Sequence, residues 1–373
     1  FKDRGYFYQC TSEDELSNLL DKEKIKAYIG FDCTAESLHV GSLLQIMCLR
    51  LLQKNGHRPI VLLGGGTTRI GDPSGKDKTR KILSEEEIEK NILNIKNILK
   101  KFLDNDDPST KPIFVNNFTW LKNLNYISFL RDIGKHFTIN RMLTFDSVKL
   151  RLDREQSLSY MEFNYMILQA YDFLELNNKE NCLLQIGGSD QWGNIVNGVD
   201  LIKRFSNKSV YGLTTPLITL ASGAKMGKTE NGAIWLDKKL LSAYDFWQFW
   251  RNVDDKDVLK FLKYFTNLSF AKIKEIEKYE INKQKIVLAN ETTFHSDPDV
   301  CFRTTFREVI KLLYWKKNKP TVENSFILNK WLGCKDAIVI DACNKAGSYF
   351  AKHADNYDKL FETYDWEKIT NII

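Results

Sequence analysis

The chain has 373 residues, of which 43% are hydrophobic and 27% are charged, and its formal net charge is +6. This length and apolar content predict two or three domains with substantial cores. They exclude a disordered chain, a collagen-like chain and a small disulfide scaffold. The mild positive charge permits a nucleic-acid partner without requiring one.

Apolar runs and cysteines bear on compartment and partners. No apolar run reaches the roughly 18 residues that a membrane span needs, so we expect no membrane partner. The seven cysteines include no C-x-x-C pair. Scattered free thiols in a reducing compartment, with no protein-bound metal, are therefore expected.

The first two-thirds of the chain alternates predicted strands and helices. Strands are expected at 25–31, 60–63 and 182–186, which are apolar runs that end in or close to glycine. Helices are expected at 41–53 and after Ser84, where a capping box with Glu87 precedes apolar residues at helical spacing. This alternation predicts an α/β fold built on a doubly wound, Rossmann-like parallel sheet.

The pattern changes near residues 235–240. Amphipathic helices are expected at 240–253, 257–266, 271–280 and 304–314, with Trp247 and Trp250 in a helical core. We therefore expect a first domain over 1–236, an α-helical domain over 237–322 and a small α+β tail over 323–373.

Four polar segments follow predicted strands, where ligands bind in an open parallel sheet. In segment 28–42, a glycine and an imidazole at a helix start suit a phosphate, although a lone histidine before a helix is more often a helix cap or part of the core. Segment 64–80 is rich in glycine and carries four basic residues, Lys76 and Arg80 among them. Segment 187–194 offers adjacent Asp and Gln for a ribose or a carboxylate, and the two lysines of segment 224–229 suit a polyphosphate clamp.

In this order the segments resemble a class I aminoacyl-tRNA synthetase, specifically the bacterial and organellar tyrosyl type, over roughly residues 1–290. His39-Val-Gly-Ser is similar to the His-x-Gly-His signature of the class, and Lys225-Met-Gly-Lys-Thr to its Lys-Met-Ser-Lys-Ser loop. Gly187-Gly-Ser-Asp-Gln-Trp-Gly-Asn and Tyr165-x-x-Leu-Gln169-Ala-Tyr-Asp172-Phe resemble motifs close to family-specific.

The resemblance implies an enzyme that activates L-tyrosine with ATP, accompanied by Mg²⁺, and transfers the tyrosyl group to tRNA(Tyr). The positions that match catalytic residues are Thr34, His39, Gln191, Lys225 and Lys228. Those that match ATP-binding residues are Asp32, Thr34, His39, Gly41, Ser42, Lys76, Arg80, Gly188, Asp190, Lys225, Met226, Lys228 and Thr229. Those that match tyrosine-binding residues are Tyr28, Asp72, Tyr165, Gln169, Asp172 and Gln191.

The implied tyrosine site makes chemical sense. A buried Tyr28–Asp172 pair that bonds a phenol hydroxyl would reject phenylalanine, because its own polar groups would be left unpaired. Asp72, Tyr165 and Gln169 would supply the acceptors that an ammonium needs. Helical spacing places Tyr165, Gln169 and Asp172 on one face. If Tyr165 and Gln169 faced the core instead, Asp172 would be left buried without a partner, at high cost.

Departures from the family pattern leave alternatives open. Ser42 replaces the second signature histidine, and the resemblance fades near 289–303. A catalytically silent RNA-binding relative, such as a splicing helper, is one alternative. A tryptophanyl-tRNA synthetase is another, although an indole offers no hydroxyl for the Tyr28–Asp172 pair.

The resemblance also implies domain roles and partners. The 1–236 domain would be catalytic, 237–322 would bind the anticodon arm, and 323–373 would be a degenerate or partial small RNA-binding domain. A homodimer is implied, with a helical insertion at about 117–165 as the contact, through Trp120, Phe129, Phe137, Met142, Phe145 and Met161. Bacterial cytoplasm and an organellar matrix both suit the sequence; the start at Phe1 and the Lys- and Asn-rich composition favour an organelle or a reduced-genome bacterium.

Overall fold

The computed structural model describes residues 1–73, 83–221, 223, 226–229 and 232–293. The chain forms two compact units. The first contains Phe1–Leu240 together with Lys263–Phe265, and the second contains Leu241–Leu262 and the chain from Thr266 onward.

A six-stranded sheet organises the first unit, in the order β1-β6-β5-β2-β3-β4. The strands are β1 (Gln9–Cys10), β2 (Lys26–Phe31), β3 (Arg58–Leu63), β4 (Ile113–Asn116), β5 (Cys182–Gly188) and β6 (Tyr211–Thr215). All neighbours pair in parallel except β1, which runs antiparallel to β6 at the edge. The doubly wound sheet expected from the sequence is confirmed.

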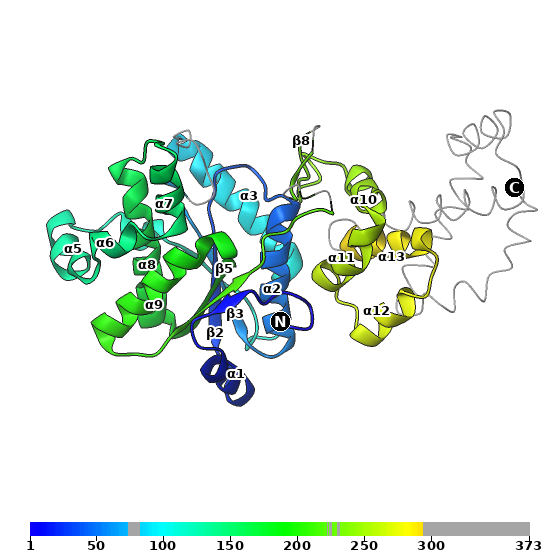
Figure 1. Ribbon diagram of the computed structural model, residues 1–373, viewed down its shortest axis with the longest axis horizontal. Coiled ribbons are helices and arrows are strands. Elements are labelled where there is room, and N and C mark those ends of the chain that lie inside the picture. Colours follow the sequence, from blue (N-terminus) through cyan, green and yellow to red (C-terminus); the bar gives the residue numbers. More distant parts are fainter. Residues whose placement is uncertain (74–82, 222, 224–225, 230–231, 294–373) are drawn as a thin grey trace, which may run out of the picture. The chain divides into compact units, whose positions relative to one another are not determined.

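Helices cover both faces of this sheet (Figure 1). Helix α2 (Leu43–Lys54), with α3 (Glu85–Leu103) beside it, packs on β2 and β3, whereas α8 (Tyr160–Glu180) and α9 (Trp192–Ser206) pack on β5 and each other. The chain therefore winds outward in opposite directions from β2 and from β5, and the carboxyl ends of these adjacent strands form the switch point where such folds bind ligands.

Local sequence explains how the two long helices begin. Ser84 and Glu87 form the predicted capping box of α3, and Ser159 and Glu162 form the same box at the start of α8. Glu162 also makes a buried ion pair with Arg151 of α7 (Asp146–Asp153), at 3.3 Å. The first turn of α8, which precedes the expected substrate residues, is thus held from two sides.

The segment between β4 and α8 is helical, as expected: it contains α4 (Phe118–Leu121), α5 (Tyr126–Asp132), α6 (Ile139–Met142) and α7. The expectation that its large apolar residues face a second copy was wrong for most of them. Trp120 and Met142 are buried inside the unit, and the three phenylalanines at 129, 137 and 145 pack against the same core. The exposed apolar side chains are a different set: Tyr126, Ile127, Leu130, Ile139, Leu143, Leu150, Leu152 and Tyr160.

The remaining elements are short strands and helices. Strands β7 (Lys228–Thr229) and β8 (Gly232–Ala233) form a hairpin, and α1 (Glu13–Lys22) follows β1. The 3₁₀ turns described in the first unit are η1 (Val40–Ser42), η2 (Thr67–Arg69), η3 (Gly134–His136) and η4 (Ser189–Gln191). Turn η5 (Asp255–Asp257) and helices α10 (Ala243–Arg251), α11 (Val258–Phe265), α12 (Phe270–Ile276) and α13 (Ile281–Thr293) follow Leu240.

The helices after Leu240 confirm the expected segments 240–253, 257–266 and 271–280. Trp247 and Trp250 are fully buried, and the Trp247 Nε1 donates to Asn290 Oδ1 at 2.8 Å. The expected helix at 304–314 and the tail at 323–373 lie outside the described residues. In the part of the chain that is described, no helix is long and apolar enough to cross a membrane.

Candidate active site

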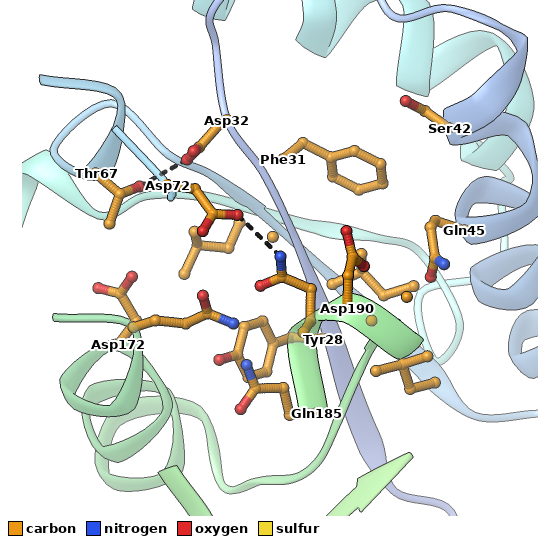
Figure 2. Close-up of a pocket in the computed structure, with 18 of the residues that line it drawn as sticks. Tyr28, Phe31, Asp32, Ser42, Gln45, Thr67, Asp72, Asp172, Gln185 and Asp190 are labelled. Atoms are coloured by element: carbon orange, nitrogen blue, oxygen red, sulfur yellow. Dashed lines mark hydrogen bonds between the residues drawn. The ribbon is translucent and has the colours of Figure 1, made fainter. Parts of the chain in front are cut away.

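A cavity of about 350 Å³ opens at the switch point, beyond the carboxyl ends of β2 and β5. Figure 2 shows Asp172, Tyr28 and Gln185 toward one end of it and Ser42 and Gln45 toward the other. Residues predicted from sequence that line it are Tyr28, Asp32, Thr34, Gly41, Ser42, Asp72, Tyr165, Gln169, Asp172, Gly188, Asp190 and Gln191.

The other predicted residues do not line this cavity or cannot be placed. His39 and Met226 are described but are not part of the cavity lining. Lys76, Arg80 and Lys225 lie outside the described residues. The backbone of Lys228 and Thr229 forms β7, but nothing follows about their side chains.

His39 caps the turn that leads into α2. Its Nδ1 accepts a hydrogen bond from the Gly41 amide at 3.0 Å, which is the simpler of the two explanations open at the sequence level. The segment that follows the lysine loop runs alongside: the Val40 amide donates to the Ile234 carbonyl at 2.8 Å, and the Leu236 amide to the Leu38 carbonyl at 2.9 Å. The histidine signature and the lysine loop, far apart in sequence, are therefore adjacent.

Gly227 fits this arrangement as no other residue would. Its φ is +125°, a conformation that L side chains rarely adopt, and a Cβ there would lie 2.7 Å from His39 Nδ1. The family resemblance marked this glycine as a departure from a serine. The contact between the two signatures supplies the physical reason for it.

Asp172 is fully buried at the closed end of the cavity, yet it does have partners. The Trp120 indole Nε1 donates to Oδ1 at 2.7 Å, and the Asn117 amide Nδ2 donates to Oδ2 at 2.9 Å. The expectation that Asp172 would lack a partner if Tyr165 and Gln169 faced the core was therefore wrong, because neither residue supplies its partners. Burial raises the pKa of Asp172 to about 7, against the opposing effect of these two N–H donors.

Asn117 is itself fixed and cannot turn its amide over. Its Oδ1 accepts from the Gly66 amide at 2.7 Å, while its Nδ2 also donates to Thr67 Oγ1 at 3.0 Å. Asn117 was not among the residues predicted from the sequence; its place directly after β4, at the carboxyl end of a strand, was the available signal.

Two polar atoms of residues that line the cavity with Asp172 are buried without a hydrogen-bond partner among the described residues. They are the Tyr28 hydroxyl and the Gln185 Oε1. Burial and the nearby Asp172 raise the pKa of Tyr28 well above its usual value, so its hydroxyl is protonated and able to donate. Because buried polar groups are nearly always paired, this end of the cavity calls for a ligand that brings a polar group.

The middle of the cavity is rich in acceptors. The Tyr165 hydroxyl donates to Asp32 Oδ2 at 3.0 Å, and Thr67 Oγ1 donates to Asp32 Oδ1 at 2.9 Å. Because Tyr165 gives its proton to Asp32, its oxygen can accept from a ligand. Asp72 receives a bond from the Gln191 amide Nε2 at 2.9 Å (Figure 2).

The open end combines backbone amides with polar side chains. Gly41 and Ser42 stand where η1 leads into α2. Gly188 allows Asp190 to approach the end of β5, since a Cβ at 188 would lie 2.6 Å from Asp190 Oδ1. Within the described residues, no group of three or more His, Cys, Asp or Glu side chains is arranged to hold a metal ion.

The chain is similar to known proteins over most of its length. Residues 20–313 match the family described as tRNA synthetases class I (W and Y). The chain is 82% identical over 293 residues to the tyrosine–tRNA ligase of Pelagibacter ubique (79% of this chain, 72% of that protein). It is 61% identical over 296 residues to that of Wolbachia pipientis subsp. Culex pipiens (78% and 70%).

A solved structure is also similar. It is that of a C-terminally truncated mitochondrial tyrosyl-tRNA synthetase from Aspergillus nidulans, with a TM-score of 0.73 at 29% identity, covering 83% of this chain and 92% of that one. With the switch-point cavity and its signature segments, these similarities give one conclusion: the chain belongs to the class I tRNA synthetase family that includes the tryptophan and tyrosine enzymes.

Proposed function

We propose that the chain is a tyrosine–tRNA ligase. It activates L-tyrosine with ATP to give tyrosyl-adenylate and pyrophosphate, then transfers the tyrosyl group to the 3′ end of tRNA(Tyr). The observation that carries this proposal is the buried hydroxyl site made by Tyr28 and Asp172 at the closed end of a cavity whose open end suits a nucleotide. The names of the relatives at 82% and 61% identity support it.

The hydroxyl site selects for a phenol. The substrate hydroxyl donates to the Asp172 carboxylate, each of whose oxygens already accepts one protein N–H, from Trp120 or Asn117. The same oxygen accepts from the Tyr28 hydroxyl. Phenylalanine would leave both groups buried and unpaired, and each such group costs about 1–3 kcal/mol. An indole fits no better, which argues against the tryptophanyl alternative.

The middle of the cavity holds the amino-acid backbone. Asp72, the Tyr165 oxygen and the Gln169 oxygen take the ammonium, and Gln191 directs an N–H toward the carboxylate. All four side chains line the cavity that Tyr28 and Asp172 also line. One cavity thus supplies groups for both ends of a tyrosine molecule.

The reaction needs positioning and charge stabilisation rather than a covalent enzyme nucleophile. The tyrosine carboxylate attacks the α-phosphate of ATP, and pyrophosphate leaves with the bond electrons. Thr34, Gly41 and Ser42 face the phosphates, Asp190 bonds the ribose, and Lys76, Arg80, Lys225, Lys228 and Thr229 neutralise the phosphate charge, with Mg²⁺ arriving on the ATP. His39 contributes by holding the turn of its own signature against the lysine loop.

We further propose that two copies pair through the helical insertion. The exposed apolar residues of α5, α6, α7 and the start of α8, among them Ile127 at 70% and Leu150 at 50%, are more than a solitary surface should carry. Residues 237–322 would then bind the anticodon arm and 323–373 would add a reduced RNA-binding tail. Among compartments, the 82% identity to a bacterial protein favours bacterial cytoplasm.

Amino-acid-dependent exchange of labelled pyrophosphate into ATP tests the activity. With Mg²⁺ present, tyrosine should support exchange far better than phenylalanine or tryptophan, and tRNA(Tyr) should then be charged. Exchange with tryptophan would favour the tryptophanyl alternative. A folded protein that supports no exchange with any of the three would favour the silent RNA-binding relative, and a Ser42→His variant would show whether the serine is responsible.

A further inference from the structure

Asn194 lies on α9 behind the cavity and is 3% exposed. It is not part of the cavity lining. Its amide Nδ2 donates to Gln169 Oε1 at 3.1 Å and to Gln191 Oε1 at 3.0 Å. One buried amide therefore joins two side chains of the amino-acid site that come from different elements, α8 and η4.

The direction of these bonds is imposed by a carboxylate. Asp72, when ionised, can only accept, so Gln191 must turn its NH₂ group toward Asp72, to which it donates at 2.9 Å. The Gln191 oxygen then points at Asn194, and Asn194 must present its own NH₂. Because that same NH₂ group also faces Gln169, the oxygen of Gln169 is turned toward Asn194 as well.

We propose that Asn194 is a positioning residue that fixes the orientation of both glutamine amides for tyrosine. This inference rests on the proposed function. With Asn194 in place, one lone pair of the Gln169 oxygen accepts from Asn194 and the other is left to accept from the substrate ammonium, while Gln191 keeps an NH₂ group between Asp72 and the substrate carboxylate. Without Asn194, the Gln169 amide can turn over and bring an N–H donor toward the ammonium, and Gln191 is held in its orientation by Asp72 alone.

Asn197 provides a matched control on the same helix. It is the same residue type one turn further along α9, and at 4% exposed it is equally buried. Its Nδ2 has no hydrogen-bond partner among the described residues, and its side chain does not line the cavity. Replacing either asparagine by alanine thus removes a buried amide from α9, but only Asn194 contacts the two glutamines.

The test compares Asn194→Ala, Asn194→Asp and Asn197→Ala in the full chain. Binding of L-tyrosine and of tyramine, which keeps the ammonium and lacks the carboxylate, is measured by calorimetry, and the KM for ATP by pyrophosphate exchange. Asn194→Ala should weaken tyrosine about tenfold or more, since two buried hydrogen bonds that orient the site are lost. The KM for ATP should stay within about twofold.

Asn194→Asp keeps the shape and reverses the polarity. An ionised aspartate there can only accept, so both glutamine amides must turn, and Gln191 would bring its oxygen against Asp72. This variant should bind tyrosine at least as poorly as Asn194→Ala and should lose more affinity for tyrosine than for tyramine. This variant also tests the positioning role if Asn194→Ala does not fold.

The outcomes are distinct. Wild-type protein that binds no tyrosine would refute the proposed function itself. Wild-type protein that binds tyrosine, with both Asn194 variants binding within about twofold of it, would refute the positioning role. So would an Asn197→Ala variant with the same loss, or an equal rise in the KM for ATP, because either result would mean that only the integrity of α9 matters.

Discussion

Trp120→Phe tests the hydroxyl site without touching the substrate. The change keeps an aromatic ring in the core but removes the indole N–H that donates to Asp172 Oδ1 at 2.7 Å. Asp172 is then left with the Asn117 amide as its described protein donor. A hydrogen bond to a charged group contributes about 1.5–3 kcal/mol. Removing this hydrogen bond therefore destabilises the ionised form of Asp172.

The sign of the pH effect follows directly. An N–H donor stabilises the carboxylate and lowers its pKa, so removing one raises the pKa of Asp172 further above its value of about 7. If tyrosine binds the ionised form, kcat/KM for tyrosine in the wild type rises with pH through about 7. In Trp120→Phe the midpoint should move upward by about one pH unit or more.

The assay is pyrophosphate exchange with tyrosine and with phenylalanine between about pH 6 and pH 8.5, where any titration of the substrate ammonium affects both amino acids alike. At pH 7.5 the variant should lose about tenfold in kcat/KM for tyrosine and much less for phenylalanine, which has no hydroxyl to bond. The matched control is Trp247→Phe, which removes an equally buried indole bond, to Asn290. That variant should lose stability and keep the wild-type pH profile.

A Trp120→Phe enzyme with an unshifted midpoint and an unchanged preference for tyrosine over phenylalanine would refute this reasoning. It would mean that the carboxylate is not the group that recognises the hydroxyl. A shift of equal size in Trp247→Phe would instead trace the change to general loss of stability.

Three further changes have defined outcomes. Tyr28→Phe removes a buried hydroxyl that has no described partner, so Tm should not fall, while the KM for tyrosine rises about fivefold or more and that for phenylalanine does not. Gly227→Ala forces a side chain onto a φ of +125° and against an imidazole, so the KM for ATP in exchange should rise about fivefold or more. Ile127→Asp should reduce the sedimentation mass from two chains to one. Leu93→Asp, an equally apolar and exposed position on α3, should leave it at two.

The sequence predicted the elements well where one element carries the whole pattern. Apolar runs ending near glycine gave β2, β3 and β5, and a capping box gave the start of α3. The face shared by Tyr165, Gln169 and Asp172 is a property of one helix, and all three do line the cavity. Periodicity within an element contains this information, so no tertiary knowledge was needed.

The features that could not be predicted from the sequence are contacts between two different elements. Trp120 and Asp172 are 52 residues apart and Asn117 and Asp172 are 55 apart, so no spacing links them. Hydrophobicity alone also could not separate Trp120 and Met142, which are buried, from Ile127 and Leu150, which are exposed. An apolar residue on a short helix serves a core or an interface equally well until the packing is known.

Both ends of the proposed tyrosine site follow the same physical rule. A carboxylate only accepts hydrogen bonds, so an amide in contact with it must turn its NH₂ group toward it. The oxygen of that amide then faces the next amide, which must turn its own NH₂ group toward that oxygen. At the hydroxyl end Asn117 holds Asp172 and is locked by Gly66. At the ammonium end Asp72 orients Gln191, and through Asn194 the direction reaches Gln169. Substitution of Asn117 should therefore alter the choice between tyrosine and phenylalanine, and substitution of Asn194 should weaken binding through the groups that all amino acids share, although neither side chain lines the cavity.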